Sequence, residues 1–472
     1  MGYKNFDLYA FDYQEVNGVR GFKVWVEDSP HGGQKLQDAV QISLPGNLDN
    51  RLRSLEDRNL DLQEIIKLGE NLGAALFPEA VRGFLSNSLT AVQATGDRLR
   101  IRLKLDDIRL ADIPWEYAYL PKPEIPEDQR GPEGFLALDA NVSLVRYETM
   151  RGFLGNLTPR GLGPLRIAVL LSDPNKPPDY PHLQLEKEEE RIRTALVKVR
   201  GRGVNHTFYR DATSDELLGA CDSDILHFAG HGEFKTDQSP IVGMMEGKGA
   251  LILLDEDKEP DPYSVEKLQV ILSGKPLRLA VLGACETGRR DHFNNWSGIA
   301  PALARVGIPA VVGMQYKIRD KNAVHFSWGF YYALAENKTV DEAVTFGRQA
   351  VFNKCRFDER AWRDWGVPVL YLRTDAAEDG MLFPVLPTAT AGLTTTAPTG
   401  EVTVSPTGML AGTPAPGGSP SSLPTAQCLE CGAYVSGKFC HNCGTQVRCL
   451  RCSAPLPANA KFCSECAHQV VD

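Results

Sequence analysis

Two residues of this sequence, a histidine and a cysteine each set among glycines, have the types needed for nucleophilic chemistry. His231 lies in the stretch Ala229–Gly232, and Cys285 lies in the stretch Gly283–Gly288. An imidazole beside a thiol can help to form the thiolate and can later protonate a leaving amine. The glycines let the backbone approach a substrate closely. The pattern predicts a Cys/His dyad with Cys285 as nucleophile and His231 as base.

The residues around this pair have predicted roles of their own. The backbone N–H groups of Gly232 and Cys285 are expected to form an oxyanion hole. On a strand, the side chain of His227 points away from that of Leu226, so we expect a packed or hydrogen-bonded support rather than a catalyst. The predicted supporting residues are His227, Gly230, Gly283 and Glu286. Cys221 and Cys355 have no histidine at a nearby strand end and are interpreted as core or surface residues.

The elements that must position the dyad indicate an α/β domain. Apolar runs alternate with helical patterns, which is typical of a mostly parallel sheet with helices on both faces. Six strands are expected, at Leu165–Leu171, Val204–Tyr209, Asp224–Phe228, Leu277–Leu282, Ala310–Gly313 and Pro368–Leu372. The helices are expected at Glu186–Arg200, Ser264–Leu272, Gly298–Val306, Lys321–Glu336 and Val340–Phe352.

The ends of these strands predict where a substrate binds. In doubly wound sheets, ligands bind beyond the carboxyl ends of the strands. His231 and Cys285 each follow a strand directly, so they meet at one edge of the sheet if those strands are neighbours. The loop of Met314, Gln315 and Tyr316 follows another strand end and is the predicted substrate pocket. Charged residues of both signs lie near the dyad in sequence, so neither a basic nor an acidic substrate side chain is favoured.

Composition divides the chain into four predicted regions. Residues 1–155 have the pattern of an α+β region packed on the sheet domain, which covers residues 156–376. Within the first region, Trp115 is interpreted as core packing. Residues 377–426 form a linker rich in Pro, Thr, Gly and Ser, which cannot bury a core and is exposed to proteolysis, including by the enzyme itself. Residues 427–472 contain eight of the 11 cysteines.

The charge and the absence of long apolar runs restrict the partners. A formal net charge of -9 argues against electrostatic binding to nucleic acid or to an anionic membrane. The N-terminus has no apolar signal core, and no apolar run approaches the length of a membrane span. We therefore expect a cytoplasmic protein that acts on a protein or peptide substrate.

The C-terminal cysteines have the spacing of metal ligands. Four Cys-x2-Cys pairs give two sets of four thiolates, which predicts a tandem pair of zinc ribbons. Four protein ligands fill the coordination shell, so both Zn²⁺ ions are expected to be structural, and catalysis needs no cofactor. The ribbons lack a basic face, which favours a protein partner over nucleic acid. The ligands are Cys428, Cys431, Cys440, Cys443, Cys449, Cys452, Cys463 and Cys466.

These motifs are similar to those of a known family. The stretches Leu226–Gly232 and Gly283–Gly288 resemble the paired His and Cys motifs of CHAT domains, which belong to the caspase and separase clan. The resemblance covers about residues 65–375 and implies a caspase-like fold and a cysteine endopeptidase without a required third residue. Many relatives act in bacterial signalling, defence or programmed death. Further similar motifs follow in family order at Ile113–Glu116, Phe135–Asp139, Val311–Gln315, Phe330–Leu334 and Asp341–Val344.

One other function fits the sequence, and two further functions do not. A caspase-like scaffold without catalysis, which binds partner proteins, remains the main alternative. A cysteine phosphatase requires Cys-x5-Arg, and Asp291 occupies the position of that arginine. A P-loop nucleotide site is excluded because the nearest match, Gly243–Gly249, lacks the Ser or Thr and one spacer residue.

Overall fold

The computed structural model describes residues 2–31, 36–147, 164–197, 204–236, 247–284, 299–355, 362–373, 426–427 and 434–435. The chain divides into two compact units, Met1–Thr390 and Ala391–Asp472. In the second unit, the described residues are two short strands, β15 (Ala426–Gln427) and β16 (Tyr434–Val435), which pair antiparallel. Within the described ranges, no helix combines the length and the apolar character that a membrane span requires.

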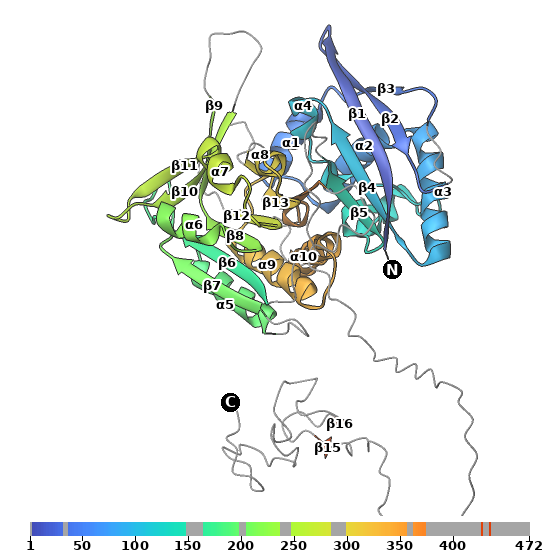
Figure 1. The fold of residues 1–472 in the computed structure, drawn as a ribbon. Coiled ribbons are helices and arrows are strands. Elements are labelled where there is room, and N and C mark those ends of the chain that lie inside the picture. The colour runs from blue at the N-terminus through green and yellow to red at the C-terminus, as the bar shows by residue number, and fades with distance from the viewer. Residues whose placement is uncertain are drawn as a thin grey trace, which may run out of the picture. The chain divides into compact units, whose positions relative to one another are not determined.

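A sheet of eleven strands is the centre of the first unit (Figure 1). Its strands are β1 (Tyr3–Val16), β2 (Val19–Asp28), β3 (Val40–Ser43), β4 (Arg98–Leu105), β5 (Val142–Arg146), β6 (Leu165–Ser172), β7 (Val204–Arg210), β8 (Ile225–Gly230), β12 (Leu279–Ala284), β13 (Ala310–Met314) and β14 (Pro368–Leu372). They lie in the order β3-β2-β1-β4-β5-β14-β13-β12-β8-β6-β7. All neighbours are parallel except β1–β2, β2–β3 and β13–β14.

The number of strands corrects the prediction of a six-stranded sheet. The six predicted strands are present and contiguous, from β14 to β7, but the N-terminal strands continue the same sheet through a parallel pairing of β5 with β14. Every residue of β5 and β14 is buried, so β14 is a central strand rather than an edge. Sequence periodicity identifies single strands but not which strands pair with each other. It therefore did not predict that β5 pairs with β14.

Helices cover both faces of the half that contains β6 to β14. In this half α9 packs against both α5 and α10, and α7 contacts α8 (Figure 1). Right-handed crossovers place α5 on one face and α6, α7 and α8 on the other. The helices of the chain are α1 (Leu48–Glu56), α2 (Leu62–Leu76), α3 (Glu79–Thr95), α4 (Ile108–Ala111), α5 (Leu185–Leu196), α6 (Ser214–Ala220), α7 (Val265–Leu272), α8 (Ile299–Arg305), α9 (Asp320–Ala335) and α10 (Val340–Cys355).

The order in which the chain adds strands to the sheet reverses at β6. The chain passes from β6 through α5 to β7 on one side of β6, and then through α6 to β8 on its other side. The loops that leave the carboxyl ends of β6 and β8 therefore diverge, and this is the topological switch point at which α/β sheets bind ligands. Both β8 and its neighbour β6 are nearly continuous apolar runs, as expected for parallel strands covered on both faces.

A small antiparallel sheet, which the sequence did not predict, follows β8 directly. It contains β9 (Gly232–Thr236), β10 (Gly247–Leu254) and β11 (Pro260–Ser264), in the order β11-β10-β9. The Ile252 N–H on β10 donates to the carbonyl oxygen of His231 at 3.0 Å, and the Ser172 hydroxyl donates to the carbonyl oxygen of Ile252 at 2.7 Å. The small sheet thus links the end of β6 to the residue that follows β8.

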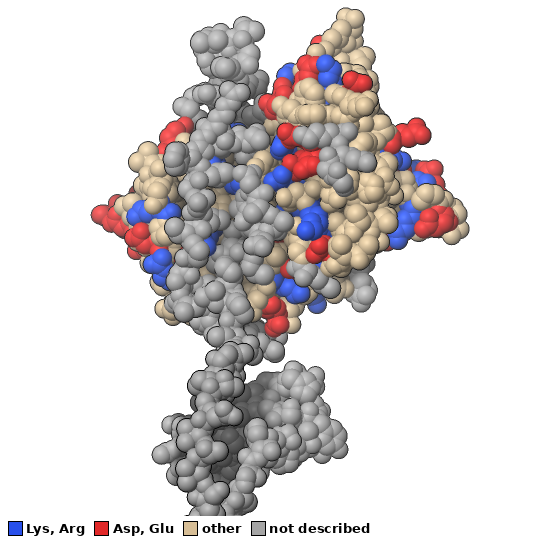
Figure 2. All heavy atoms as spheres, turned by 45° about the vertical axis from the view of Figure 1, so that its right-hand side comes forward, with Lys and Arg blue, Asp and Glu red and all other residues tan. Residues whose placement is uncertain are grey.

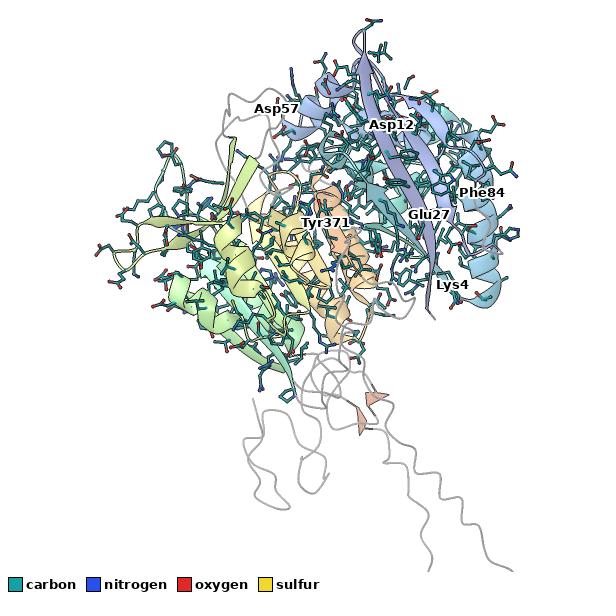
Figure 3. The ribbon with its side chains drawn as sticks, turned by 45° about the horizontal axis from the view of Figure 1, so that its top comes forward. Lys4, Asp12, Glu27, Asp57, Phe84 and Tyr371 are labelled. Carbon is teal, nitrogen blue, oxygen red and sulfur yellow. The ribbon has the colours of Figure 1, made fainter. Side chains whose placement is uncertain are left out.

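Buried polar contacts join the N-terminal strands to the rest of the first unit. The guanidinium of Arg100 on β4 makes two bonds of 2.8 Å to the carboxylate of Asp341 on α10, and the Ser143 hydroxyl on β5 donates to the same carboxylate at 2.8 Å. Tyr371 of β14 lies where the two halves of the sheet meet (Figure 3). Trp115 is fully buried and donates from its indole nitrogen to the Leu110 carbonyl at 2.7 Å, so it is a core residue.

Candidate active site

The two strands that precede the predicted dyad are neighbours and end together. Strands β8 and β12 are parallel, and their register pairs Gly230, the last residue of β8, with Ala284, the last residue of β12. His231 follows Gly230 in the chain, and Cys285 follows Ala284. Cys285 and Glu286 lie outside the described residues. The described strand ends therefore bring the positions before both candidates to one edge of the sheet.

His231 is buried, with 1% of its surface exposed, and its imidazole is held by a backbone carbonyl. Its Nε2 lies 2.9 Å from the carbonyl oxygen of Pro181, in the loop after β6. A carbonyl oxygen only accepts, so Nε2 carries the proton and, in the neutral ring, Nδ1 is the basic nitrogen. The ring of Tyr180 lies 5.5 Å from the imidazole, between ring centroids. This arrangement sets both the tautomer and the orientation that a general base needs.

The loop that carries Pro181 is itself held by a carboxylate. Asp173 lies directly after β6, and its Oδ2 accepts a hydrogen bond from the Leu183 N–H at 3.2 Å and lies 2.6 Å from His182 Nδ1. The Tyr180 hydroxyl donates to the carboxylate of Glu233 on β9. The residues on either side of Pro181 are thus tied to the end of β6 and to β9.

A buried polar network lies beneath the strand ends. His227 is fully buried, and its Nδ1 lies 3.0 Å from the Tyr331 hydroxyl of α9. Burial raises the pKa of Tyr331 well above 10, so this hydroxyl stays protonated. The other ring nitrogen, Nε2, lies 3.4 Å from Glu188 Oε1 on α5. The Ser327 hydroxyl donates to the same oxygen at 2.6 Å.

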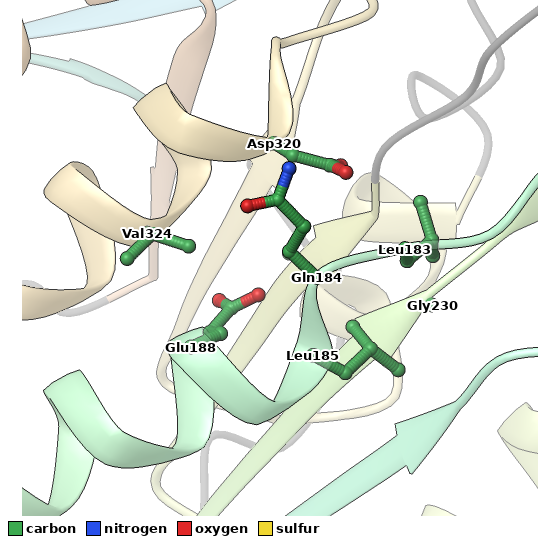
Figure 4. Close-up of a pocket in the computed structure, with 8 residues that line it drawn as sticks. Leu183, Gln184, Leu185, Glu188, Gly230, Asp320 and Val324 are labelled. Atoms are coloured by element: carbon green, nitrogen blue, oxygen red, sulfur yellow. The ribbon is translucent and has the colours of Figure 1, made fainter.

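A pocket opens beside this network, at the ends of β8 and β12 (Figure 4). In that view the Gln184 side chain extends toward Asp320, and Glu188 and Val324 lie to the left. The pocket combines the loop after β6, the first turns of α5 and α9, and two strand-end glycines. Its lining residues are Leu183, Gln184, Leu185, Glu188, Gly230, Gly283, Asp320 and Val324.

Sequence reasoning missed the contribution of α5 and α9 to this pocket. One signal was present: Glu188 lies three residues after Leu185 and four before Ile192, on the apolar face of the helix, and all three residues are buried. A carboxylate at a buried helical position usually has a specific partner or role. Asp320 carried no comparable signal, because an acidic residue in the first turn of a helix is common.

The predicted pocket loop after β13 is placed differently from this pocket. Met314, Gln315 and Tyr316 are buried, and none of them lines the pocket. The Gln315 side chain accepts a hydrogen bond from Arg146 at 2.9 Å and donates to the Asp112 carbonyl at 3.0 Å. These bonds tie the loop to the N-terminal half. The pocket is lined instead by residues a few positions later, on α9.

The remaining predicted residues have these positions. Gly232 begins β9 and pairs with Leu251 of β10. Gly283 lines the pocket, and a Cβ there would lie 3.5 Å from both Glu188 Oε1 and His227 Nε2.

Cys221 is fully buried, and burial raises the pKa of its thiol to about 11. The eight C-terminal cysteines lie outside the described residues. On the face shown in Figure 2, acidic and basic side chains are interspersed.

Comparisons with known proteins identify the family. Comparison with curated proteins gives no match. Among solved structures, the chain is similar to the Arg-specific cysteine proteinase gingipain R, with a TM-score of 0.39 and 12% identity over 71% of this chain and 77% of that chain. It is also similar to separase in the Saccharomyces cerevisiae separase–securin complex, with a TM-score of 0.44 and 11% identity over 78% of this chain and 30% of that chain. The family model described as the CHAT domain matches residues 67–373, more than half of the sequence, and the chain belongs to the CHAT family.

Proposed function

We propose that this protein is a caspase-like cysteine endopeptidase in which Cys285 is the nucleophile and His231 is the general base. The pairing of Gly230 with Ala284 carries the proposal, because each candidate follows one of these paired residues. Neighbouring strands lie about 4.8 Å apart, so groups one residue beyond two paired strand ends are within reach of each other. The bond from His231 Nε2 to the Pro181 carbonyl supports the proposal, since it leaves Nδ1 as the base.

The chemistry requires no group beyond the dyad, a water molecule and backbone amides. The His231 imidazole takes the proton of the Cys285 thiol, and the thiolate attacks the peptide carbonyl carbon, forming a C–S bond. The N–H groups of Gly232 and Cys285 stabilise the oxyanion. The C–N bond breaks as the imidazolium gives its proton to the leaving amine. Water then loses a proton to the imidazole and attacks the thioester, and the thiol is restored as the C–S bond breaks.

Peptide cleavage by the purified full-length chain tests this proposal. We expect Cys285→Ala and His231→Ala to lower cleavage of a broad peptide library by about 1,000-fold or more. Cys221→Ala and His206→Ala are the matched controls, since they remove a buried cysteine of the core and an exposed histidine of β7. Mass spectrometry of the new peptide termini is the readout. Identical cleavage by the wild type and Cys285→Ala contradicts the peptidase and favours the scaffold.

The second unit is proposed to contain two zinc ribbons. The described strands support this, because β15 and β16 pair antiparallel and Cys428 and Cys431 lie between them in the chain. A Cys-x2-Cys pair in the connection of a hairpin fits a zinc knuckle. Bound zinc would supply folding energy to a module too small for an apolar core. We propose that the ribbons bind a protein partner that recruits or regulates the peptidase, with residues 377–426 as a tether.

A further inference from the structure

Three aromatic side chains gather on the outer side of the helices α9 and α10, which lie side by side (Figure 1). Trp328 and Tyr332 lie one turn apart on α9, and their rings stack with centroids 5.4 Å apart. The ring of Phe346 on α10 lies 5.6 Å from that of Tyr332 and 6.5 Å from that of Trp328. Phe346 is 37% exposed, and the other two residues are half-buried. We call these three residues the aromatic cluster.

The packing of the two helices explains why the aromatic cluster faces outward. Phe326 and Phe330 of α9 are fully buried, and a side chain two positions further along a helix points about 200° away. A Cβ on Gly329 would lie 2.9 Å from the Cβ of Ala350, and a Cβ on Gly347 would lie 2.7 Å from the Phe326 ring. The helices are therefore too close for large rings between them. A contiguous aromatic surface of this kind is typical of an interaction site, whereas scattered apolar residues are not.

The linker of this chain contains a segment suited to such a surface. Residues 381–387, Met-Leu-Phe-Pro-Val-Leu-Pro, combine five large apolar side chains with two prolines, whereas Pro, Thr, Ala, Gly and Ser dominate the linker after them. Pro384 and Pro387 have the spacing Pro-x2-Pro, which places both rings on one face of a polyproline II helix with three residues per turn. Segments of this type bind surfaces lined by aromatic rings, and they lose little entropy because they are extended before binding.

The end of β14 puts this segment within reach of the aromatic cluster. Leu372, the last residue of β14, pairs with Ala310, the first residue of β13. Helix α9 begins beyond the other end of β13 and packs back along the sheet, where it contacts β12. Tyr332 lies about 18 Å along the helix from its first residue, and β13 is about 17 Å long, so Tyr332 is near the level of Ala310. Residues 374–380 can span up to about 23 Å when extended.

We propose that residues 381–387 bind the aromatic cluster of α9 and α10 as a polyproline II segment of the same chain. The contact attaches the start of the linker to the first unit and shortens the free tether to residues 388–426. It does not depend on the proposed peptidase activity. A short tether gives an effective concentration of about 1 mM, so a weak contact with a Kd of about 0.1 mM keeps the segment bound about 90% of the time.

Limited proteolysis of the full-length Cys285→Ala chain tests the contact from the side of the linker, without cleavage by the chain itself. Thermolysin cuts before large apolar residues, and mass spectrometry measures the rate of cutting within residues 381–386. We expect Phe346→Asp to raise this rate by about 10-fold, because the segment is released. Cutting before Val402, Val404 and Leu410, further along the linker, should stay unchanged. Val270→Asp is the matched control, since Val270 is 77% exposed on α7.

Hydroxyl-radical footprinting tests the same contact from the side of the helices. We expect the paired changes Leu382→Ser and Leu386→Ser to raise the oxidation rate of Trp328 about twofold or more, because the segment no longer covers its ring. Trp115 and Trp365 are fully buried and should not change. This variant alters no described residue, so it decides the proposal even if Phe346→Asp unfolds the chain. An unchanged oxidation rate of Trp328, or an unchanged rate of cutting in a folded Phe346→Asp chain, overturns the contact. Protection that decreases on dilution also overturns it, in favour of a second copy of the chain.

Discussion

At the scale of single residues, the two glycines near the strand ends differ in how much room surrounds them. A Cβ on Gly230 would lie 2.7 Å from the Ser172 carbonyl oxygen and 2.7 Å from the Phe228 ring, and the Ser172 backbone cannot easily shift. A Cβ on Gly283 would have its nearest contacts at 3.5 Å, which is an ordinary van der Waals distance. Packing therefore requires a glycine at position 230, whereas position 283 has room for a Cβ.

This difference predicts opposite results for two alanine substitutions. We expect Gly230→Ala to lower the free energy of unfolding by about 1–3 kcal/mol, because it overpacks the junction of β6 and β8. Gly283→Ala should keep the melting temperature of the wild type, because its Cβ would meet only ordinary van der Waals contacts, and its effect on peptide cleavage is measured alongside. Calorimetry and peptide kinetics measure the two effects. Equal melting temperatures for both variants and the wild type contradict the packing argument.

Cys221 provides a second test at this scale. Burial raises the pKa of its thiol to about 11, so at pH 8 only about one thiol in a thousand is ionised. We expect iodoacetamide to leave Cys221 unmodified in the folded protein at pH 8 and to modify it readily in urea, where the thiol regains its ordinary pKa. Mass spectrometry of the peptide that contains Cys221 measures the difference. Equal modification in both conditions would show that the residue is accessible.

At the scale of elements, one ion pair connects β4 to α10. Both Arg100 and Asp341 are fully buried, and their two parallel bonds make the contact bidentate. Removing one partner of a buried pair leaves the other charge uncompensated. The neighbouring pair of Arg98 and Glu342 joins the same two elements but is partly exposed, which makes it a matched control.

These two pairs give a prediction for stability. We expect Asp341→Ala to lower the free energy of unfolding by about 3–5 kcal/mol, because Arg100 keeps its charge in the core. Arg98→Ala should cost about 1 kcal/mol or less, because water solvates the remaining carboxylate. Urea unfolding of the full-length chain, followed by tryptophan fluorescence, measures both values. A loss of similar size for the two variants would contradict a special role for the buried pair.

Much of the element pattern was predictable. The six predicted strands and the five predicted helices of the sheet domain agree with β6–β8, β12–β14, α5 and α7–α10 within a few residues at most ends. Long apolar runs and clear helical spacing identify such elements. Helix α6 and strands β9–β11 were missed. They are short, and the stability of β9–β11 depends on pairing and on bonds such as that from Ile252 to His231.

At the scale of the whole molecule, the metal content tests the proposed ribbons. We expect the purified chain to carry one zinc ion for each set of four cysteines, and Cys440→Ser to halve that content. Chelation should unfold the ribbons while the melting temperature of the unit Met1–Thr390 changes by no more than about 1 °C. Plasma mass spectrometry and calorimetry are the measurements, with Cys221→Ala as control. A zinc content that Cys440→Ser leaves unchanged would exclude the predicted ligand set.

The sequence by itself determined the family, the central strands and the two candidates for catalysis, because these depend on residues that are close together in the chain. His231 and Cys285 were found from the strands and glycines beside them. Only the tertiary structure decided that Pro181, Glu188 and Asp320 lie at the same sheet edge. These three come from a loop and two helices, and they meet because the chain reverses direction at β6 and folds α9 against α5. Contacts between distant segments depend on packing in three dimensions, which local periodicity does not contain.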